Sequence, residues 1–231
     1  MNVDKLCAGC EDCSKRAPLF SVLNEEELKQ VNKDRYSVRF HEGEVIIKQG
    51  TKAGYLVSVI EGFAKMYIEG HNDRNLILDF VKPWNLIGGP CAYIDGKHRY
   101  SVVAIQETLV CFIDVNNFKK VSATNSAFSE QILIHCSNSY AQTLDRMVGL
   151  SQKQMHGRIA DALIYLTEQI YEGSIVGGAI SRQDIADYTS MSKDSAIRIL
   201  KEFERDGIIN LVGRSIEILS GEKLHDISQR G

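Results

Sequence analysis

Apolar positions in the first half of the chain fall into short runs rich in β-branched and aromatic residues. Between residues 36 and 118, such runs cover residues 45–47, 55–60, 64–68, 76–78 and 109–113. Turn signals separate them, including Glu42-Gly43 and Glu61-Gly62. Many short strands at this spacing predict a β-sandwich or small barrel, and a jelly roll of this kind encloses a pocket. We therefore expect this half to be a sensor or binding domain.

After Asn116 the apolar positions recur every three or four residues, which predicts helices. The clearest helix covers residues 128–151, with no Pro or Gly before Gly149, and would be about 36 Å long. Its apolar stripe favours a homodimeric coiled coil, and packing of the stripe wholly against its own barrel is the alternative. Polar residues at Ser139 and Thr143 interrupt the stripe and indicate a marginal dimer. The predicted dimer interface comprises Ile132, Cys136, Tyr140, Thr143, Leu144 and Met147.

An amphipathic helix over residues 158–171 precedes a predicted helix-turn-helix. The first helix, residues 181–188, begins with a capping box from Ser181 to Asp184, and Ser192 is the N-cap of the second. Small and apolar residues fall where two crossing helices touch: Ile185, Ala186, Met191, Ala196, Ile199 and Leu200. Residues 208–212 and 216–219 then form a hairpin, which completes a winged helix-turn-helix. A helical hairpin that only packs is the alternative.

The outward positions of this segment are the candidate DNA contacts. The net charge is 27 − 30 = −3, so the whole molecule has no general attraction for nucleic acid. DNA binding would therefore depend on where individual basic side chains lie. Arg198 is best suited to read guanine with two hydrogen bonds, and Asp194 can accept one from a cytosine amine. The predicted DNA-binding residues are Arg182, Lys193, Asp194, Ser195, Ile197, Arg198, Lys201 and Arg214.

Three of the six cysteines lie within seven residues, as Cys7, Cys10 and Cys13 in a C-x-x-C-x-x-C pattern. This spacing lets one short loop turn three thiolates toward a single centre, which is typical of iron–sulfur clusters and zinc. The fourth ligand would come from elsewhere, and Cys111 and Cys91 are the candidates. The alternative is a segment whose cysteines bind nothing. Cys136 lies on the apolar stripe of the long helix, where a core role is expected.

Several function classes are disfavoured. No stretch approaches the roughly 18 consecutive apolar residues of a membrane helix, and the start lacks the apolar core of a signal peptide, so we expect a cytoplasmic protein without a membrane partner. There is no Gly-rich phosphate loop and no nucleophile–base motif, so an enzyme is not predicted. His41, His71 and His98 are widely separated, and we expect them at surface turns or as hydrogen-bonded polar groups.

The order of barrel, long helix and winged helix-turn-helix resembles the CRP/FNR family of bacterial transcription regulators over essentially the whole chain. Residues 185–188 and 191–200 resemble its recognition motif, and residues 104–113 resemble the segment that carries the fourth cysteine of the oxygen-sensing FNR branch. The resemblance implies a homodimer on a double-stranded DNA operator, with RNA polymerase as a further partner if the protein is an activator. It also implies a 4Fe–4S cluster held by Cys7, Cys10, Cys13 and Cys111.

Departures from the family pattern qualify these expectations. Asp194 and Ile197 stand where the family has glutamate and serine, so a different DNA site is expected, and the Cys10–Cys13 spacing is shorter than in the FNR of enteric bacteria. Thr143 replaces the acidic residue that tunes dimerisation in FNR, which puts that switch in doubt. Family members that bind cyclic AMP have Gly-Glu and Arg-Ser pairs. Here Gly89 follows Gly88 and residues 98–101 hold no clean Arg-Ser pair, so cyclic AMP binding is not expected.

The sequence thus predicts an α+β chain with four parts. These are a cysteine-rich arm (1–17), a cyclic-nucleotide-binding-like β jelly roll (18–120), a long dimerisation helix (121–154) and a winged helix-turn-helix (155–231). The predicted function is a transcription regulator in which a 4Fe–4S cluster senses oxygen or redox state and controls dimerisation and DNA binding. The same regulator responding to nitric oxide or to a small molecule in the barrel is the alternative, with the cysteines binding zinc or nothing. A zinc-stapled or electron-carrying protein without regulatory output is a second class.

Overall fold

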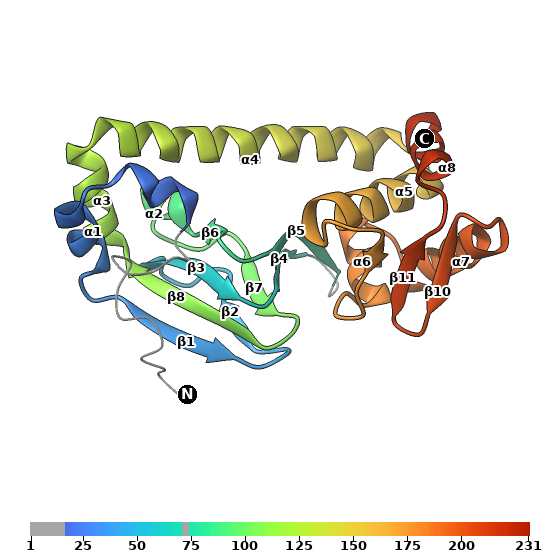
Figure 1. The fold of residues 1–231 in the computed structure, drawn as a ribbon, viewed down its shortest axis with the longest axis horizontal. Helices are drawn as coiled ribbons and strands as arrows, with labels where there is room; N and C mark the ends of the chain where they lie inside the picture. The colour runs from blue at the N-terminus through green and yellow to red at the C-terminus, as the bar shows by residue number, and fades with distance from the viewer. Residues whose placement is uncertain (1–16, 71–73) are drawn as a thin grey trace. The chain divides into compact units, whose positions relative to one another are not determined.

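The computed structural model describes residues 17–70 and 74–231 (Figure 1). The chain forms two compact units. The first comprises the chain up to Ile68 together with Phe80–Tyr140, and the second comprises Glu69–Asp79 together with Ala141–Gly231. Helix α4 (Ser126–Gln152) carries the chain from the first unit into the second.

Within the described residues, eight strands between residues 36 and 114 form two four-stranded sheets, in the orders β1-β8-β3-β6 and β2-β7-β4-β5. Their bounds are β1 Tyr36–Phe40, β2 Val45–Ile47, β3 Tyr55–Glu61, β4 Ala64–Glu69, β5 Asn75–Val81, β6 Leu86–Ile87, β7 Ser101–Ala104 and β8 Thr108–Asp114. Strand β8 pairs antiparallel with β1 and β3, β7 pairs antiparallel with β2 and β4, and β6 pairs antiparallel with β3. The five predicted β-rich runs all lie in strands, whereas no run was predicted at β1, β6 or β7.

Alternation along β8 divides the apolar core between two clusters. Leu109, Cys111 and Ile113 belong to a cluster with the 3₁₀ turn Pro18–Val22 and the helices α1 (Glu25–Asn32) and α3 (Val115–Thr124). Val110 belongs to the cluster between the sheets. Successive side chains of a strand point to opposite faces, so Cys111 faces the helical side of its sheet.

The second unit contains the predicted winged helix-turn-helix. Helix α5 (Met155–Tyr165) continues into a π-helical turn at Leu166–Ile170, and α6 (Arg182–Tyr188) and α7 (Lys193–Arg205) follow. The wing is a three-stranded sheet in the order β10-β11-β9, built from Ile209–Val212, Ser215–Ile218 and Ile175–Val176. A final helix, α8 (Gly221–Arg230), was not predicted. The α+β fold of β domain, long helix and winged helix-turn-helix is confirmed. In the described part of the chain, no helix is long and apolar enough to span a membrane.

Candidate functional site

Local chemistry explains why residues 181–205 form two helices joined by a tight turn. The side chains of Ser181 and Asp184 form the predicted capping box, and Ser192 accepts a hydrogen bond from the Ser195 amide. Ala186 and Ala196 are completely buried where the helices cross. Because both side chains are small, the two backbones can approach closely and α7 is held rigidly against α6.

Most of the predicted DNA contacts lie on the solvent side of α7. Lys193, Asp194, Arg198 and Lys201 are exposed, whereas Ser195 and Ile197 are half-buried. An open groove along this face is lined by Asp194, Ile197, Arg198, Lys201, Glu202 and Arg205. The structure therefore brings four predicted residues together in one groove and adds Glu202 and Arg205, which sequence reasoning missed.

Arg182 and Arg214 lie at the junction of α6 and the wing. The Arg182 guanidinium donates hydrogen bonds to the carbonyl oxygens of Arg214 (3.2 Å) and Ser215 (3.4 Å). Burial lowers the pKa of Arg182. The side chain of Arg182 thus braces the wing in this structure, and Arg214 is exposed beside the wing turn at Gly213.

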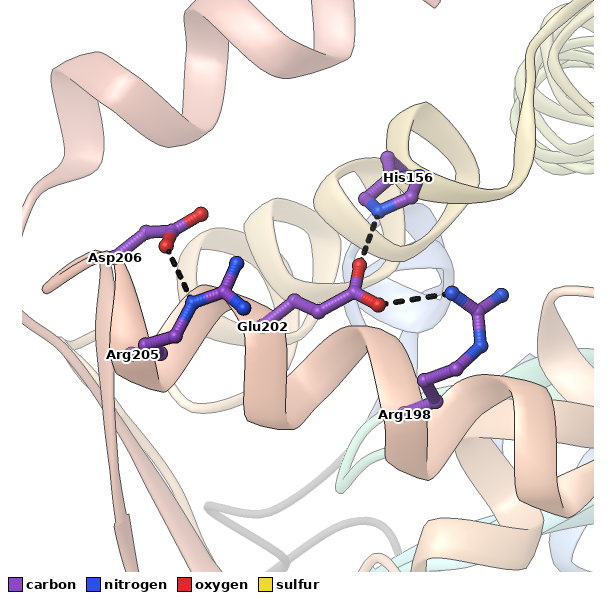
Figure 2. Close-up of polar contacts among 5 residues, drawn as sticks. All are labelled: His156, Arg198, Glu202, Arg205 and Asp206. Atoms are coloured by element: carbon purple, nitrogen blue, oxygen red, sulfur yellow. Dashed lines mark hydrogen bonds and ion pairs between the residues drawn. The ribbon is translucent and has the colours of Figure 1, made fainter.

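Figure 2 shows a polar chain that joins α5 to α7. Nε2 of His156 lies 2.7 Å from one carboxylate oxygen of Glu202, and Nη1 of Arg198 lies 2.8 Å from the other. These bonds lower the pKa of Glu202, with the His156 hydrogen bond as the largest cause. The four-residue spacing of Arg198 and Glu202 was a signal available in the sequence, whereas nothing in the sequence indicated that His156 would reach them.

Cys111 is the predicted cysteine ligand that lies within the described residues. Its side chain is only 3% exposed, and Nη1 of Arg35 donates to its sulfur at 3.3 Å. The strand register pairs Cys111 with Ser37 on one side and Ser58 on the other, and both serines are buried. Ala17 belongs to the same apolar cluster as Cys111.

The other metal candidates are distributed differently. Cys7, Cys10 and Cys13 lie outside the described residues. Cys91 is buried on α2 (Gly89–Ile94), outside the cluster that contains Ala17 and Cys111. Among the residues that the structure describes, no three His, Cys, Asp or Glu side chains are grouped as they would be to hold a metal ion.

The segment to which the family resemblance assigns cyclic nucleotide contacts has two of its polar groups bonded within the chain. The Gly88 amide donates to the Tyr100 hydroxyl at 2.9 Å. Burial, as the largest cause, raises the pKa of Tyr100. Arg99 is exposed and pairs with Asp95 at 2.6 Å. A ligand phosphate would have to displace Tyr100 from Gly88 and Arg99 from Asp95.

The expectation for His98 was wrong. Its side chain is neither at the surface nor fully hydrogen-bonded: His98 is 7% exposed, and within the described chain its Nδ1 has no hydrogen-bond partner. The reason lies in the backbone, because the His98 amide donates to Thr51 and its carbonyl accepts from Gly50. These bonds turn the imidazole inward next to Gly88.

The predicted apolar stripe of α4 divides between two faces. Ile132 packs against the apolar cluster of its own domain, and Cys136 lines a small cavity there with Leu19 and Leu86. Six large apolar residues of α4 are instead exposed: Leu133 (66% exposed), Tyr140 (65%), Met147 (60%), Val148 (52%), Ile134 (45%) and Leu144 (43%). Thr143 is exposed beside them. The residues open to a partner are thus the last four of the predicted interface together with Leu133, Ile134 and Val148.

Comparisons with known proteins agree with this architecture. Residues 37–125 match the cyclic nucleotide-binding domain and residues 157–227 match the Crp-like helix-turn-helix domain. The nitrogen fixation regulation protein FixK of Bradyrhizobium diazoefficiens is 24% identical over 224 residues, covering 95% of this chain and 93% of FixK. The anaerobic regulatory protein of Aggregatibacter actinomycetemcomitans is also 24% identical, covering 95% of this chain and 87% of that protein.

A solved structure shares the fold. FixK2 from Bradyrhizobium japonicum aligns with a TM-score of 0.76 at 22% identity, covering 84% of this chain and 96% of that chain. The two matched domains occur in the same order as the β domain and the winged helix-turn-helix described above. The helix-turn-helix implies DNA binding, and the family consists of transcription regulators rather than enzymes. This chain belongs to the CRP/FNR family of DNA-binding transcription regulators.

Proposed function

We propose that this regulator is a cytoplasmic homodimer that senses oxygen or redox state through a 4Fe–4S cluster held by Cys7, Cys10, Cys13 and Cys111. The observation that carries the proposal is the environment of Cys111. Its buried thiol faces the apolar cluster that contains Ala17, and Ala17 follows Cys13 by four residues. Four residues span at most about 14 Å, so Cys13 can lie no farther than this from Ala17.

The donor set fits such a cluster. Cysteine thiolates are its usual ligands, and an N–H donor to a ligand sulfur is one of the features by which proteins tune these clusters. Arg35 supplies such a donor to Cys111. When bound, a 4Fe–4S cluster supplies a redox-active and oxygen-sensitive centre. Ligation by Cys111 together with the trio would fasten the segment before Ala17 to strand β8.

The exposed residues of α4 support the homodimer. Leu133, Tyr140 and Met147 are seven residues apart, and Leu144 lies between the last two on the same side of the helix. A seven-residue repeat of apolar side chains is the pattern of two-stranded coiled coils. The stripe is short and the exposed Thr143 interrupts it, so we expect its own contribution to dimerisation to be small. A second contribution, such as an ordered segment before Ala17, would then decide the monomer–dimer balance.

The dimer connects to the DNA-binding output. Residues of one helix-turn-helix contact a single half-site, and two recognition helices on a dimer reach major grooves about 34 Å apart. The name of the Aggregatibacter relative, an anaerobic regulatory protein, supports oxygen as the signal. Nitric oxide attacks the same kind of centre and remains the alternative input.

The test is a visible spectrum with iron and sulfide assays on anaerobically purified full-length protein. We expect a brown protein with about four irons and four sulfides per chain, which bleaches in air and loses dimer and DNA affinity together. Cys111→Ser should abolish the colour, whereas Cys91→Ser should retain it. A protein that stays colourless and iron-free after anaerobic reconstitution would overturn the proposal and leave zinc or a barrel ligand.

A further inference from the structure

Glu202 is an acidic side chain in a surface that should face DNA. It lies in the same groove as Asp194, Arg198 and Lys201. A carboxylate on such a surface repels phosphate and weakens non-specific binding. We therefore looked for a favourable effect of Glu202 on DNA binding that would offset this repulsion.

Each oxygen of the Glu202 carboxylate has a hydrogen-bond partner, one on α7 itself and one on α5. Oε1 accepts from Nη1 of Arg198 at 2.8 Å, and Oε2 lies 2.7 Å from Nε2 of His156. A carboxylate only accepts hydrogen bonds, so His156 donates from Nε2. His156 also packs against Phe203, with ring centroids 6.0 Å apart. Glu202 is thus bonded to His156 on α5 and, at the same time, to Arg198 one turn away on α7.

Helix stabilisation does not explain this arrangement. Along a helix, the favourable order places the acid four residues before the base. Here Arg198 precedes Glu202, which is the less favourable order, and the Arg198 side chain is 53% exposed. An exposed pair of this kind contributes little to stability. The hydrogen bond instead restricts the conformations that the Arg198 side chain can adopt.

The bond to Glu202 leaves most of the Arg198 donors available. A guanidinium has five N–H groups, and Glu202 takes one of those on Nη1. The edge formed by Nη2 and Nε stays open for two parallel hydrogen bonds to guanine O6 and N7. Arginine has a flexible side chain, and immobilising such a side chain at an interface costs free energy. A guanidinium fixed before binding avoids part of this cost and favours one base over the others.

We infer that Glu202, supported by His156, is a positioning residue that sets DNA sequence specificity by fixing Arg198 for base readout. The inference uses the DNA binding of this family and does not depend on an iron–sulfur cluster. It predicts opposite effects on two kinds of DNA when Glu202 is removed. Specific binding weakens because Arg198 is no longer oriented, whereas non-specific binding tightens because a negative charge has gone.

The experiment uses full-length protein purified anaerobically and a duplex that the wild type selects from a random library. Affinities are measured for this duplex, for each of its single-base-pair variants and for an unrelated duplex. We expect Glu202→Ala to weaken binding to the selected duplex by about fivefold or more, mainly by losing discrimination at one base pair in each half-site. Binding to the unrelated duplex should be unchanged or tighter. Glu222→Ala removes the same charge from an exposed position on α8 and should not affect discrimination.

Two further variants separate positioning from a structural role. His156→Ala should lower discrimination at the same base pair, and His156→Gln, which retains a donor, should recover it. In an Arg198→Ala background, Glu202→Ala should have no further effect on discrimination. Thermal unfolding of every variant is measured alongside.

Three results would overturn the inference. Equal tightening on all duplexes would make Glu202 a simple repulsive charge. Equal weakening on all duplexes with a lower melting temperature would make it a structural residue. Loss of discrimination that persists without Arg198 would separate Glu202 from that arginine.

Discussion

The guanidinium of Arg146 lies 4.0 Å from the centroid of the Tyr188 ring and donates a 2.7 Å hydrogen bond to the Tyr188 carbonyl oxygen. The same guanidinium donates to the carbonyl oxygens of Ile77 and Leu78 in β5. Arg158 donates to the carbonyl oxygen of Thr189, the C-cap residue that follows α6. Two arginines therefore meet the C-terminal end of α6, where the helix dipole favours positive charge. Within the second unit, this cluster joins α4, the first half of β5 and the helix-turn-helix.

Arg146→Ala should destabilise the second unit. Three carbonyl groups lose a charged donor, and the expected loss is about 2–4 kcal/mol of unfolding free energy. Calorimetry of the full chain measures the effect as a lower melting temperature of one transition. Arg146→Lys should fall between the wild type and the alanine variant because one ammonium group cannot serve three carbonyls spread over two elements. The exposed Arg74→Ala is the control, and an equal loss there would contradict the assignment.

Gly62→Ala tests the tight turn between β3 and β4. Gly62 has φ = +84°, and an added Cβ would lie 2.3 Å from the Glu107 carbonyl oxygen. We expect a loss well above the roughly 1–2 kcal/mol that a left-handed conformation costs an ordinary residue. Gly43 has the same φ with open space around it, so Gly43→Ala should show only that conformational cost. Chemical unfolding of the two variants compares them, and equal losses would show that the contact with Glu107 is relieved.

His98 should make the β domain less stable in mild acid. Burial lowers its pKa below the ordinary value of 6.5, so the folded protein keeps the imidazole neutral while the unfolded chain takes up a proton. The unfolded state then binds more protons, and stability falls as the pH drops through about 6.5. Urea unfolding between pH 7.5 and 5.5 should show a flatter pH dependence for His98→Gln than for the wild type. The exposed His41→Gln is the control and should leave the slope unchanged.

Leu144→Glu should weaken the proposed dimer. The substitution places a charge in the middle of the exposed stripe on α4, where two copies would bury it. Analytical ultracentrifugation of anaerobically purified protein should show a shift toward monomer by at least about tenfold in the dissociation constant. Asn138→Glu places the same charge on an exposed position away from the stripe and should leave the dimer intact. A dimer that tolerates Leu144→Glu would exclude this face as the interface.

Cyclic AMP should neither stabilise the protein nor change its DNA affinity. The Gly88 amide is already bonded to Tyr100, and Arg99 is paired with Asp95, so a phosphate gains these contacts only by breaking existing ones. A ligand at one hundred times its dissociation constant would add about 2.7 kcal/mol of stability. A thermal shift with millimolar cyclic AMP is therefore a sensitive test, and a clear increase in melting temperature would show that Tyr100 moves aside.

The elements that depend on neighbouring residues in the chain were predictable from the sequence. The capping box at Ser181 marks a helix start through contacts three residues apart, and it is present. The runs of residues 45–47 and 109–113 lie in β2 and β8 because alternation and β-branched side chains act locally. The inward residues of the helix-turn-helix, such as Ala186 and Ala196, were also identified, because helical periodicity fixes which side chains face each other.

Contacts between distant segments were decided only by the tertiary structure. The bond from Arg35 to Cys111 joins residues 76 apart, and that from His156 to Glu202 joins residues 46 apart. The inward turn of His98 follows from backbone bonds to Thr51 and Gly50. The division of α4 into a face that packs on its own domain and a face open to a partner depends on which turn meets the barrel. Local sequence carries no record of such distances, because the orientation of one element on another is set by the packing of the whole core.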